Sequence, residues 1–154
     1  SLMPKASVKR LIECEKDDLI KLVLDIEKYP EFVPFCFDAK VYEEKNQGDL
    51  IKIIADLTIG KGPFKDTYKS DVVLDKRKDT IFVKNIEGPL NHLSNNWTFT
   101  DKQNGITEIA FDIDFEIKNK FLNSLMVVSF QFGLEKIADA FQKRAEELFG
   151  SSKN

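Results

Sequence analysis

The amino-acid sequence predicts an α+β fold: a curved antiparallel sheet of about six to seven strands wraps a long C-terminal helix, with short helices after the first strand. Apolar and polar residues alternate through much of residues 37–117, as in an antiparallel sheet with one buried and one solvated face. The alternation is clearest at Ile109, Phe111, Ile113, Phe115 and Ile117. Residues 119–149 then change to helical spacing. A sheet curved over this helix buries both apolar surfaces.

The chain begins with a predicted strand over residues 6–14 and a short amphipathic helix over 15–28. This helix must end before Tyr29-Pro30, because the residue that precedes a proline is driven out of the α region. Residues 29–36 follow as an aromatic segment held by two prolines. We therefore expect neither a long helix nor a solvated loop there.

Polar and glycine-rich breaks divide the rest of the sheet into strands. They fall at 46–49, 60–63, 75–79, 88–89 and 101–105. Asn119 is placed to cap the last helix, and Gly150 is placed to end it. The first half of this helix carries apolar residues around more of its circumference than one core-facing stripe needs.

The length of 154 residues suits one domain, which we predict over residues 3–150. Ser1 and Leu2 precede a methionine and are interpreted as a cloning scar, and residues 151–154 are expected to be a disordered tail. The net charge of −3 argues against a general nucleic-acid binder, so we expect no DNA partner. Cys14 and Cys36 are too few for a disulfide framework, which favours an intracellular protein.

The sequence offers little support for catalysis. His92 is the sole histidine, and no HExxH, CxxC, GxGxxG or Walker motif is present. Strand alternation places His92 on the solvated face, opposite Trp97. Cys14 and Cys36 are interpreted as small core residues. We predict a non-enzymatic protein with no catalytic residues, no metal site and no required cofactor.

Four polar residues share a strand face with apolar neighbours and are expected to point inward. These are Asp66, Tyr68, Ser70 and Asn95. A polar group inside a core is costly unless it forms hydrogen bonds. They either satisfy one another and the backbone, or they line a cavity and donate to the carbonyl groups of a ligand. Sequence alone leaves both alternatives open.

The excess apolar surface on the last helix also has two interpretations. Phe121, Leu125 and Met126 either belong to a plain core or line the mouth of a cavity, where they touch membrane during lipid transfer. The aromatic residues of segment 29–36 raise the same choice.

Several short motifs occur along the chain in a fixed order. They are Tyr29–Cys36, Gly62-Pro63-Phe64, Asn95–Phe99, Phe111–Phe115, and Ala140-Phe141 followed by Arg144-Ala145. Together they resemble the START-like, helix-grip superfamily of polyketide cyclases and lipid transport proteins, specifically its coenzyme Q-binding branch. That branch also includes proteins labelled ribosome association toxin. The resemblance spans residues 5–149 and implies a deep apolar cavity between the sheet and the long helix, with no common catalytic set.

The resemblance implies non-enzymatic binding and transfer of ubiquinone or a related isoprenoid lipid, in support of respiratory electron transport. Such a protein contacts a membrane transiently, and we favour a monomer. A bacterial source implies cytoplasm with peripheral inner-membrane contact, and a eukaryotic source implies the mitochondrial matrix face. The expected cavity residues are Phe32, Val33, Phe35, Phe64, Tyr68, Ser70, Asn95, Trp97, Phe111, Phe115, Leu125, Met126 and Phe130.

The same resemblance provides an alternative, a ribosome association toxin-type protein that binds the large ribosomal subunit and blocks subunit joining. RNA contact requires a basic patch. The candidate patch consists of Lys61, Lys65, Lys69, Lys76, Arg77 and Lys78. Aromatic polyketide cyclase activity is a third possibility and has the least support, because no acid/base pair presents itself.

Overall fold

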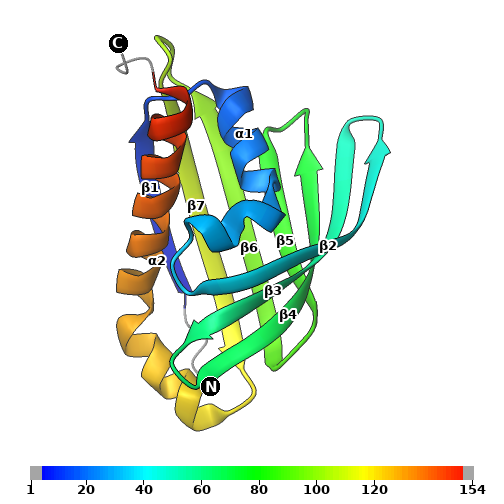
Figure 1. Cartoon of the computed structure of the whole chain (residues 1–154), viewed down its shortest axis with the longest axis vertical. Coiled ribbons are helices and arrows are strands. Elements are labelled where there is room, and N and C mark those ends of the chain that lie inside the picture. Colours follow the sequence, from blue (N-terminus) through cyan, green and yellow to red (C-terminus); the bar gives the residue numbers. More distant parts are fainter. Residues whose placement is uncertain (1–4, 151–154) are drawn as a thin grey trace.

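The computed structural model describes residues 5–150, except for the side chains of 127 and 128, so the predictions for 1–2 and 151–154 lie outside it. Its elements are β1 (Lys5–Ile12), α1 (Lys16–Leu24), the 3-10 helix η1 (Ile26–Glu31), β2 (Cys36–Gln47), β3 (Leu50–Lys61), β4 (Phe64–Asp75), β5 (Thr80–Glu87), β6 (Leu90–Asp101), β7 (Thr107–Ile117) and α2 (Lys120–Phe149) (Figure 1). Within the described residues, seven antiparallel strands form one sheet in the order β1-β7-β6-β5-β4-β3-β2. The predicted α+β fold is confirmed.

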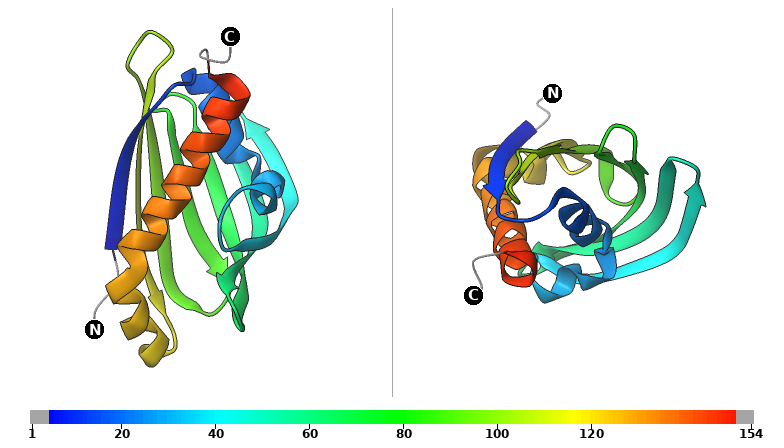
Figure 2. Two further views of the ribbon diagram at one scale, coloured as in Figure 1. Left: turned by 60° about the vertical axis from the view of Figure 1, so that its left-hand side comes forward. Right: turned by 90° about the horizontal axis from the view of Figure 1, so that it is seen from above.

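The sheet is strongly curved. Seen from above, it curls around α1, and α2 lies along the gap between its two edges, β1 and β2 (Figure 2). Register shifts in β2, between Cys36 and Asp38 and between Val41 and Glu43, mark irregularities that increase local twist. Gly60 lets β3 and β4 meet tightly near their turn, since a Cβ there would lie 2.0 Å from the carbonyl oxygen of Phe64.

The helix predicted over residues 15–28 is instead two helices. The α-helical geometry of α1 ends at Leu24, and η1 continues the chain through Pro30. The prediction that α geometry ends before Tyr29-Pro30 is confirmed, but it ends earlier than expected. Tyr29 is half-buried against the core and donates a hydrogen bond from its hydroxyl to the carbonyl of Val23. That burial raises the pKa of Tyr29 far above its ordinary value.

An aromatic cluster around Phe141 fastens the C-terminal half of α2 to the rest of the protein. The Phe141 ring meets Tyr29, Phe32 and Trp97 edge-on, at centroid distances of 5.3, 5.1 and 5.2 Å. Trp97 also packs on Phe111 at 4.1 Å. Such edge-on contacts stabilise a core beyond the burial of apolar area. The cluster joins α2 to both η1 and the sheet.

The ends of α2 are as predicted. The Asn119 side chain accepts hydrogen bonds from the backbone N–H groups of Phe121 and Leu122. The helix ends at Phe149, and Gly150 follows. Among residues 5–150, no helix is both long and apolar enough to cross a bilayer.

Replacing Phe141 by alanine tests the importance of this cluster. We expect the Phe141→Ala variant to lose about 3–5 kcal/mol of unfolding free energy, because the change leaves a cavity between three rings. Urea denaturation measures the loss. Phe132→Ala is the matched control, since that ring on the same helix is 65% exposed and its removal is expected to cost below about 1 kcal/mol. Equal losses in the two variants would contradict the assignment.

Candidate ligand-binding site

The inner face of the sheet is buried at one end and open at the other. At the end where α2 terminates, the inward residues of five successive strands are almost completely buried. These are Ile53, Val72, Ile81, Trp97 and Ile109. Toward the start of α2, residues on the same face of the same strands become half-buried. These are Leu57, Tyr68, Val83, Leu93 and Ile113. The inner face is therefore accessible at this second end, which we call the open end.

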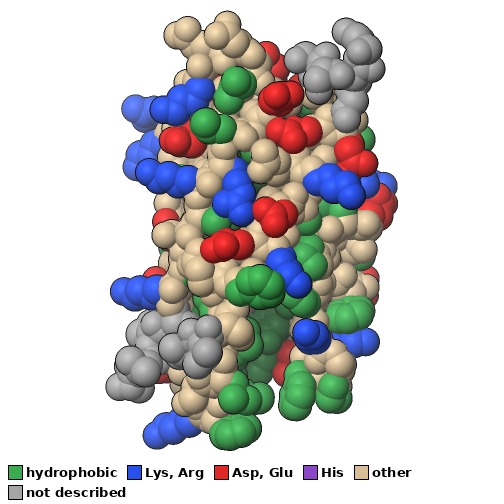
Figure 3. Space-filling model, turned by 90° about the vertical axis from the view of Figure 1, so that its left-hand side faces the viewer, with side chains coloured by type: hydrophobic (Ala, Val, Ile, Leu, Met, Phe, Trp, Pro, Cys, Tyr) green, Lys and Arg blue, Asp and Glu red, His purple; other side chains and the backbone are tan. Residues whose placement is uncertain are grey.

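The open end has an apolar recess. Figure 3 shows a hollow lined by hydrophobic side chains between the first turns of α2 and the turn that joins β3 to β4. Further up, the contacts of η1 with α2 close this gap, including an ion pair of 2.7 Å between Arg144 and Glu31. Phe32 lies in this closing layer, with the Arg144 guanidinium 5.0 Å from its ring centroid.

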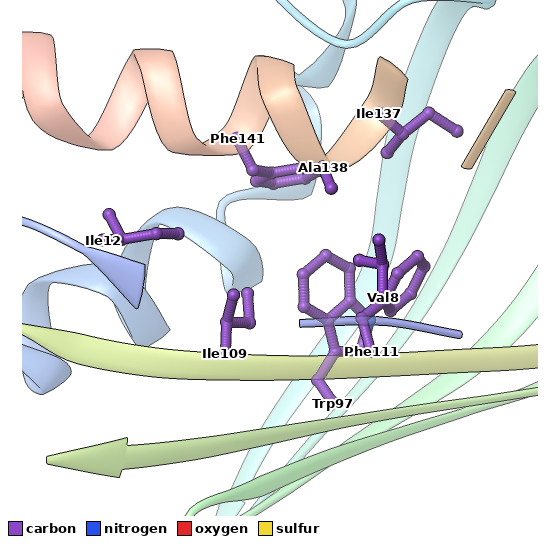
Figure 4. Close-up of a pocket in the computed structure, with 8 residues that line it drawn as sticks. All are labelled: Val8, Ile12, Trp97, Ile109, Phe111, Ile137, Ala138 and Phe141. Atoms are coloured by element: carbon purple, nitrogen blue, oxygen red, sulfur yellow. The ribbon is translucent and has the colours of Figure 1, made fainter. Parts of the chain in front are cut away.

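Trp97 and Phe111, two of the predicted cavity residues, border only a small space. The space that they border with Val8, Ile137 and Phe141 measures about 10 Å³ (Figure 4), room for about one water molecule. The rings fill it because α2 packs closely on β1 and β7 at this level. Trp97 and Phe111 therefore form the closed end above the recess, not a lipid-sized chamber.

Phe115 and Phe130 contact each other near the open end. Phe115 on β7 is buried under Phe130 of α2, with ring centroids 4.4 Å apart. Val33 and Phe35 lie half-buried in the segment between η1 and β2. Phe35 adopts a positive φ of 70°, and its carbonyl accepts a hydrogen bond from Gly60 N–H, which ties this segment to the end of β3.

Large exposed apolar side chains surround the open end. Phe64 keeps the inward phase of β4 but is 68% exposed, because it lies beyond the reach of α2. Phe121 and Leu125 on α2 are 72% and 54% exposed, and Met126 is also exposed. We call Phe64, Phe121, Leu125 and Met126 the rim. Lys61, Lys118 and Lys120 are exposed beside it in sequence.

The predicted inward polar residues have different environments. Asn95 is buried and satisfied: its Oδ1 accepts from Trp97 Nε1, and its Nδ2 donates to the Asp112 carbonyl, both at 2.8 Å. Ser70 is buried, and Tyr68 is half-buried, with its pKa raised by burial and by nearby Asp66. The Asp66 side chain itself is exposed.

Asn85 belongs to this polar group, and the sequence analysis missed it. Its side chain lies on the inner face of β5, directly opposite Ser70. Its Oδ1 is buried and has no hydrogen-bond partner among the described residues. The alternation of Ile81 and Val83 with Asn85 was the signal that could have identified it.

The six cations proposed as one basic patch are divided into two groups. Lys61 ends β3, and Lys65 and Lys69 lie in the first half of β4, whereas Lys76–Lys78 follow the far end of β4. The seven residues from Lys69 to Lys76 span about 23 Å along the chain. The six cations are therefore close in sequence but do not form a single patch.

The remaining candidate groups have structural partners. His92 is half-exposed, and its Nε2 forms a hydrogen bond with the Asp114 carboxylate on β7. Cys14 and Cys36 are buried free thiols, as predicted, and burial raises the pKa of each to about 11. Such thiols are protonated at neutral pH and hence weak nucleophiles.

A curved seven-stranded sheet gripped by a long helix, with an apolar recess between them, defines the START-like, helix-grip class of ligand-binding folds. The chain belongs to the family described as polyketide cyclase / dehydrase and lipid transport, which matches residues 12–142. The predicted resemblance is confirmed.

Similar proteins carry two different functional names. The chain is 31% identical over 142 residues to a ribosome association toxin, RatA, of Rickettsia prowazekii, covering 90% of this chain and 94% of that protein. It is 32% identical over 140 residues to the mitochondrial coenzyme Q-binding protein COQ10 of Dictyostelium discoideum, covering 88% of this chain and 66% of that one. The names thus leave the particular ligand and partner open.

Solved structures agree on the fold. An 18 kDa protein from Caulobacter crescentus superposes with a TM-score of 0.77 at 25% identity, covering 94% of this chain and 97% of that one. The aromatase/cyclase ZhuI from Streptomyces superposes with a TM-score of 0.81 at 14% identity, covering 99% of each chain. Both comparisons therefore support the fold of this chain.

Proposed function

We propose that this protein is a non-enzymatic carrier that binds ubiquinone or a related isoprenoid lipid in the recess and exchanges it with a membrane, in support of respiratory electron transport. The observation that carries the proposal is the loss of burial along the inner face toward the open end. Half-buried apolar residues such as Leu57, Val83 and Ile113 gain about 25 cal/mol for each Å² that an apolar ligand covers. The coenzyme Q-binding name of one relative supports the choice of ligand.

The rim gives this carrier a route to the bilayer. Its apolar side chains extend from two elements, the β3–β4 turn and the first turns of α2, with lysines beside them. Large exposed apolar groups are typical of interaction surfaces, and lysines favour the anionic surface of a membrane. A lipid tail leaving a bilayer at this point enters the recess without crossing water.

Filling the recess tests ligand binding. We expect Leu57→Trp to lower ubiquinone uptake from liposomes at least about tenfold, because the larger side chain occupies the volume that the ligand needs. Uptake is measured by re-isolating the protein, extracting it with organic solvent and quantifying quinone by mass spectrometry. Leu11→Trp is the matched control, since Leu11 is exposed on the outer face of β1. A protein that takes up no quinone without any substitution would refute the proposed function.

Charging the rim tests the membrane route. We expect the double variant Phe121→Asp/Leu125→Asp to lose flotation with vesicles that contain phosphatidylglycerol, because carboxylates replace the inserted apolar groups. Leu148→Asp is the control, since Leu148 lies at the other end of α2 and is as exposed as Leu125, at 54%. Unchanged flotation and unchanged lipid loading of the double variant would exclude the rim as the docking surface.

A separate structural feature supports a second candidate function, binding to the large ribosomal subunit. The outer face of β2–β4 carries exposed Phe37 and Tyr42 with lysines over their rings. Lys65 Nζ lies 3.9 Å from the Phe37 centroid, and Lys40 and Lys69 lie 4.9 and 5.0 Å from that of Tyr42. Rings and cations on one face suit the stacked bases and phosphates of RNA. The toxin name of a relative that matches this chain over most of its length supports the same candidate.

Charge reversal on this outer face tests the second candidate. We expect Lys40→Glu/Lys65→Glu/Lys69→Glu to abolish co-sedimentation with purified large subunits, and binding before substitution to fall steeply with salt. The control is Lys76→Glu/Arg77→Glu/Lys78→Glu, which makes the same charge change at the far end of β4. Equal loss in both triple variants would indicate a general charge effect instead of a specific face.

A further inference from the structure

The inner face of the sheet contains a polar position that the fold leaves unsatisfied. Asn85 Oδ1 is buried without a donor, although Ser70 lies directly opposite on the neighbouring strand. Residues opposite each other in an antiparallel pair have Cβ atoms about 5 Å apart. Neither Ser70 nor Tyr68 uses its hydroxyl in a hydrogen bond within residues 5–150. Three adjacent polar groups therefore lack protein partners.

These groups lie at a particular depth. Ser70 is buried beside fully buried Val72 on its own strand, while Tyr68, two residues nearer the open end, is half-buried. Gly88, just after β5, packs closely on this part of β4, since a Cβ there would lie 3.1 Å from the Thr67 carbonyl oxygen and in van der Waals contact with Tyr68 Cδ1 at 3.5 Å. The group thus marks the inner end of the recess, where the polar head of a ligand arrives if its tail points to the rim.

The charges that face this part of the recess restrict the head group. Strand alternation places Asp66 on the inner face near Tyr68, and its negative charge helps to raise the Tyr68 pKa. On the inner face of β3–β7, Lys61 pairs with Phe64 at the exposed end of β3, and the described residues between Ser70 and that end include no lysine or arginine. At the depth of Ser70 and Tyr68, a phosphate or carboxylate head would meet nearby Asp66 and no cation of the sheet. This environment favours a neutral head group.

Building on the proposed carrier function, we propose that Asn85, Ser70 and Tyr68 form a head-group subsite for a neutral, hydroxyl-bearing ring, so that the protein binds a hydroquinone in preference to the corresponding quinone. The buried Asn85 oxygen is an acceptor and needs a donor. A hydroquinone hydroxyl supplies one, whereas a quinone offers only carbonyl acceptors. The Ser70 and Tyr68 hydroxyls can serve either form, so the discrimination comes from Asn85.

The test compares decylubiquinol with decylubiquinone in anaerobic equilibrium binding to the intact protein. We expect the quinol to bind about tenfold more tightly, the size of effect that one satisfied buried acceptor supplies. Asn85→Leu removes the acceptor at almost constant volume and is expected to abolish this preference. Asn96→Leu is the matched control, since Asn96 lies on β6 with the opposite strand phase from Asn95.

Thermal unfolding separates a binding role from a structural one. An unsatisfied buried acceptor destabilises the empty protein, so Asn85→Leu is expected to keep or raise Tm. A lower Tm, equal binding of the two ligands before substitution, or a quinol preference that survives in Asn85→Leu would each overturn the subsite. Failure of both ligands to bind would instead refute the proposed carrier function. Binding of both with equal affinity leaves that function standing and removes only the subsite.

Discussion

The packing of Phe141 against Tyr29, Phe32 and Trp97 determines where α2 touches the sheet, and the recess is a consequence of it. The helix has 30 residues and is about 45 Å long. Its C-terminal half buries Leu134, Ala138, Phe141 and Ala145. A curved sheet cannot follow one helix along its whole length. Where they diverge, the inner face loses its cover, and the first turns of α2 keep Phe121, Leu125 and Met126 exposed.

The polar residues of the inner face lie where this cover ends. Asn95 is buried at no net cost because Trp97 Nε1 and the Asp112 carbonyl satisfy it. Asn85, on the next strand, lacks such partners. An unsatisfied buried acceptor costs about 1–3 kcal/mol, and proteins retain such costs mainly at functional positions. The Asn95 amide therefore stabilises the fold, whereas the Asn85 amide is available to a ligand.

Sequence predicted the elements well because they follow from local rules. The alternation at Ile109–Ile117 specified β7, and Asn119 specified the start of α2. The sequence-based predictions failed where contacts between distant segments determine the environment of a residue. Phe64 has the predicted phase but lies beyond α2, and the role of Asn85 depends on its register with Ser70. Identifying the candidate site requires knowing how deeply each residue is buried in the fold. The alternation of residues along a strand does not give that information.

The two candidate functions use opposite faces of the same strands. On β4, Tyr68 and Ser70 point into the recess, while Lys65 and Lys69 point outward over Phe37 and Tyr42. This separation follows from strand alternation, because successive side chains point to opposite faces of the sheet. A substitution at one position therefore leaves the side chain of the next residue on the opposite face. Ligand binding and ribosome binding are thus physically compatible in one chain. Because each depends on its own set of side chains, substitutions on one face can remove one function while the other stays intact.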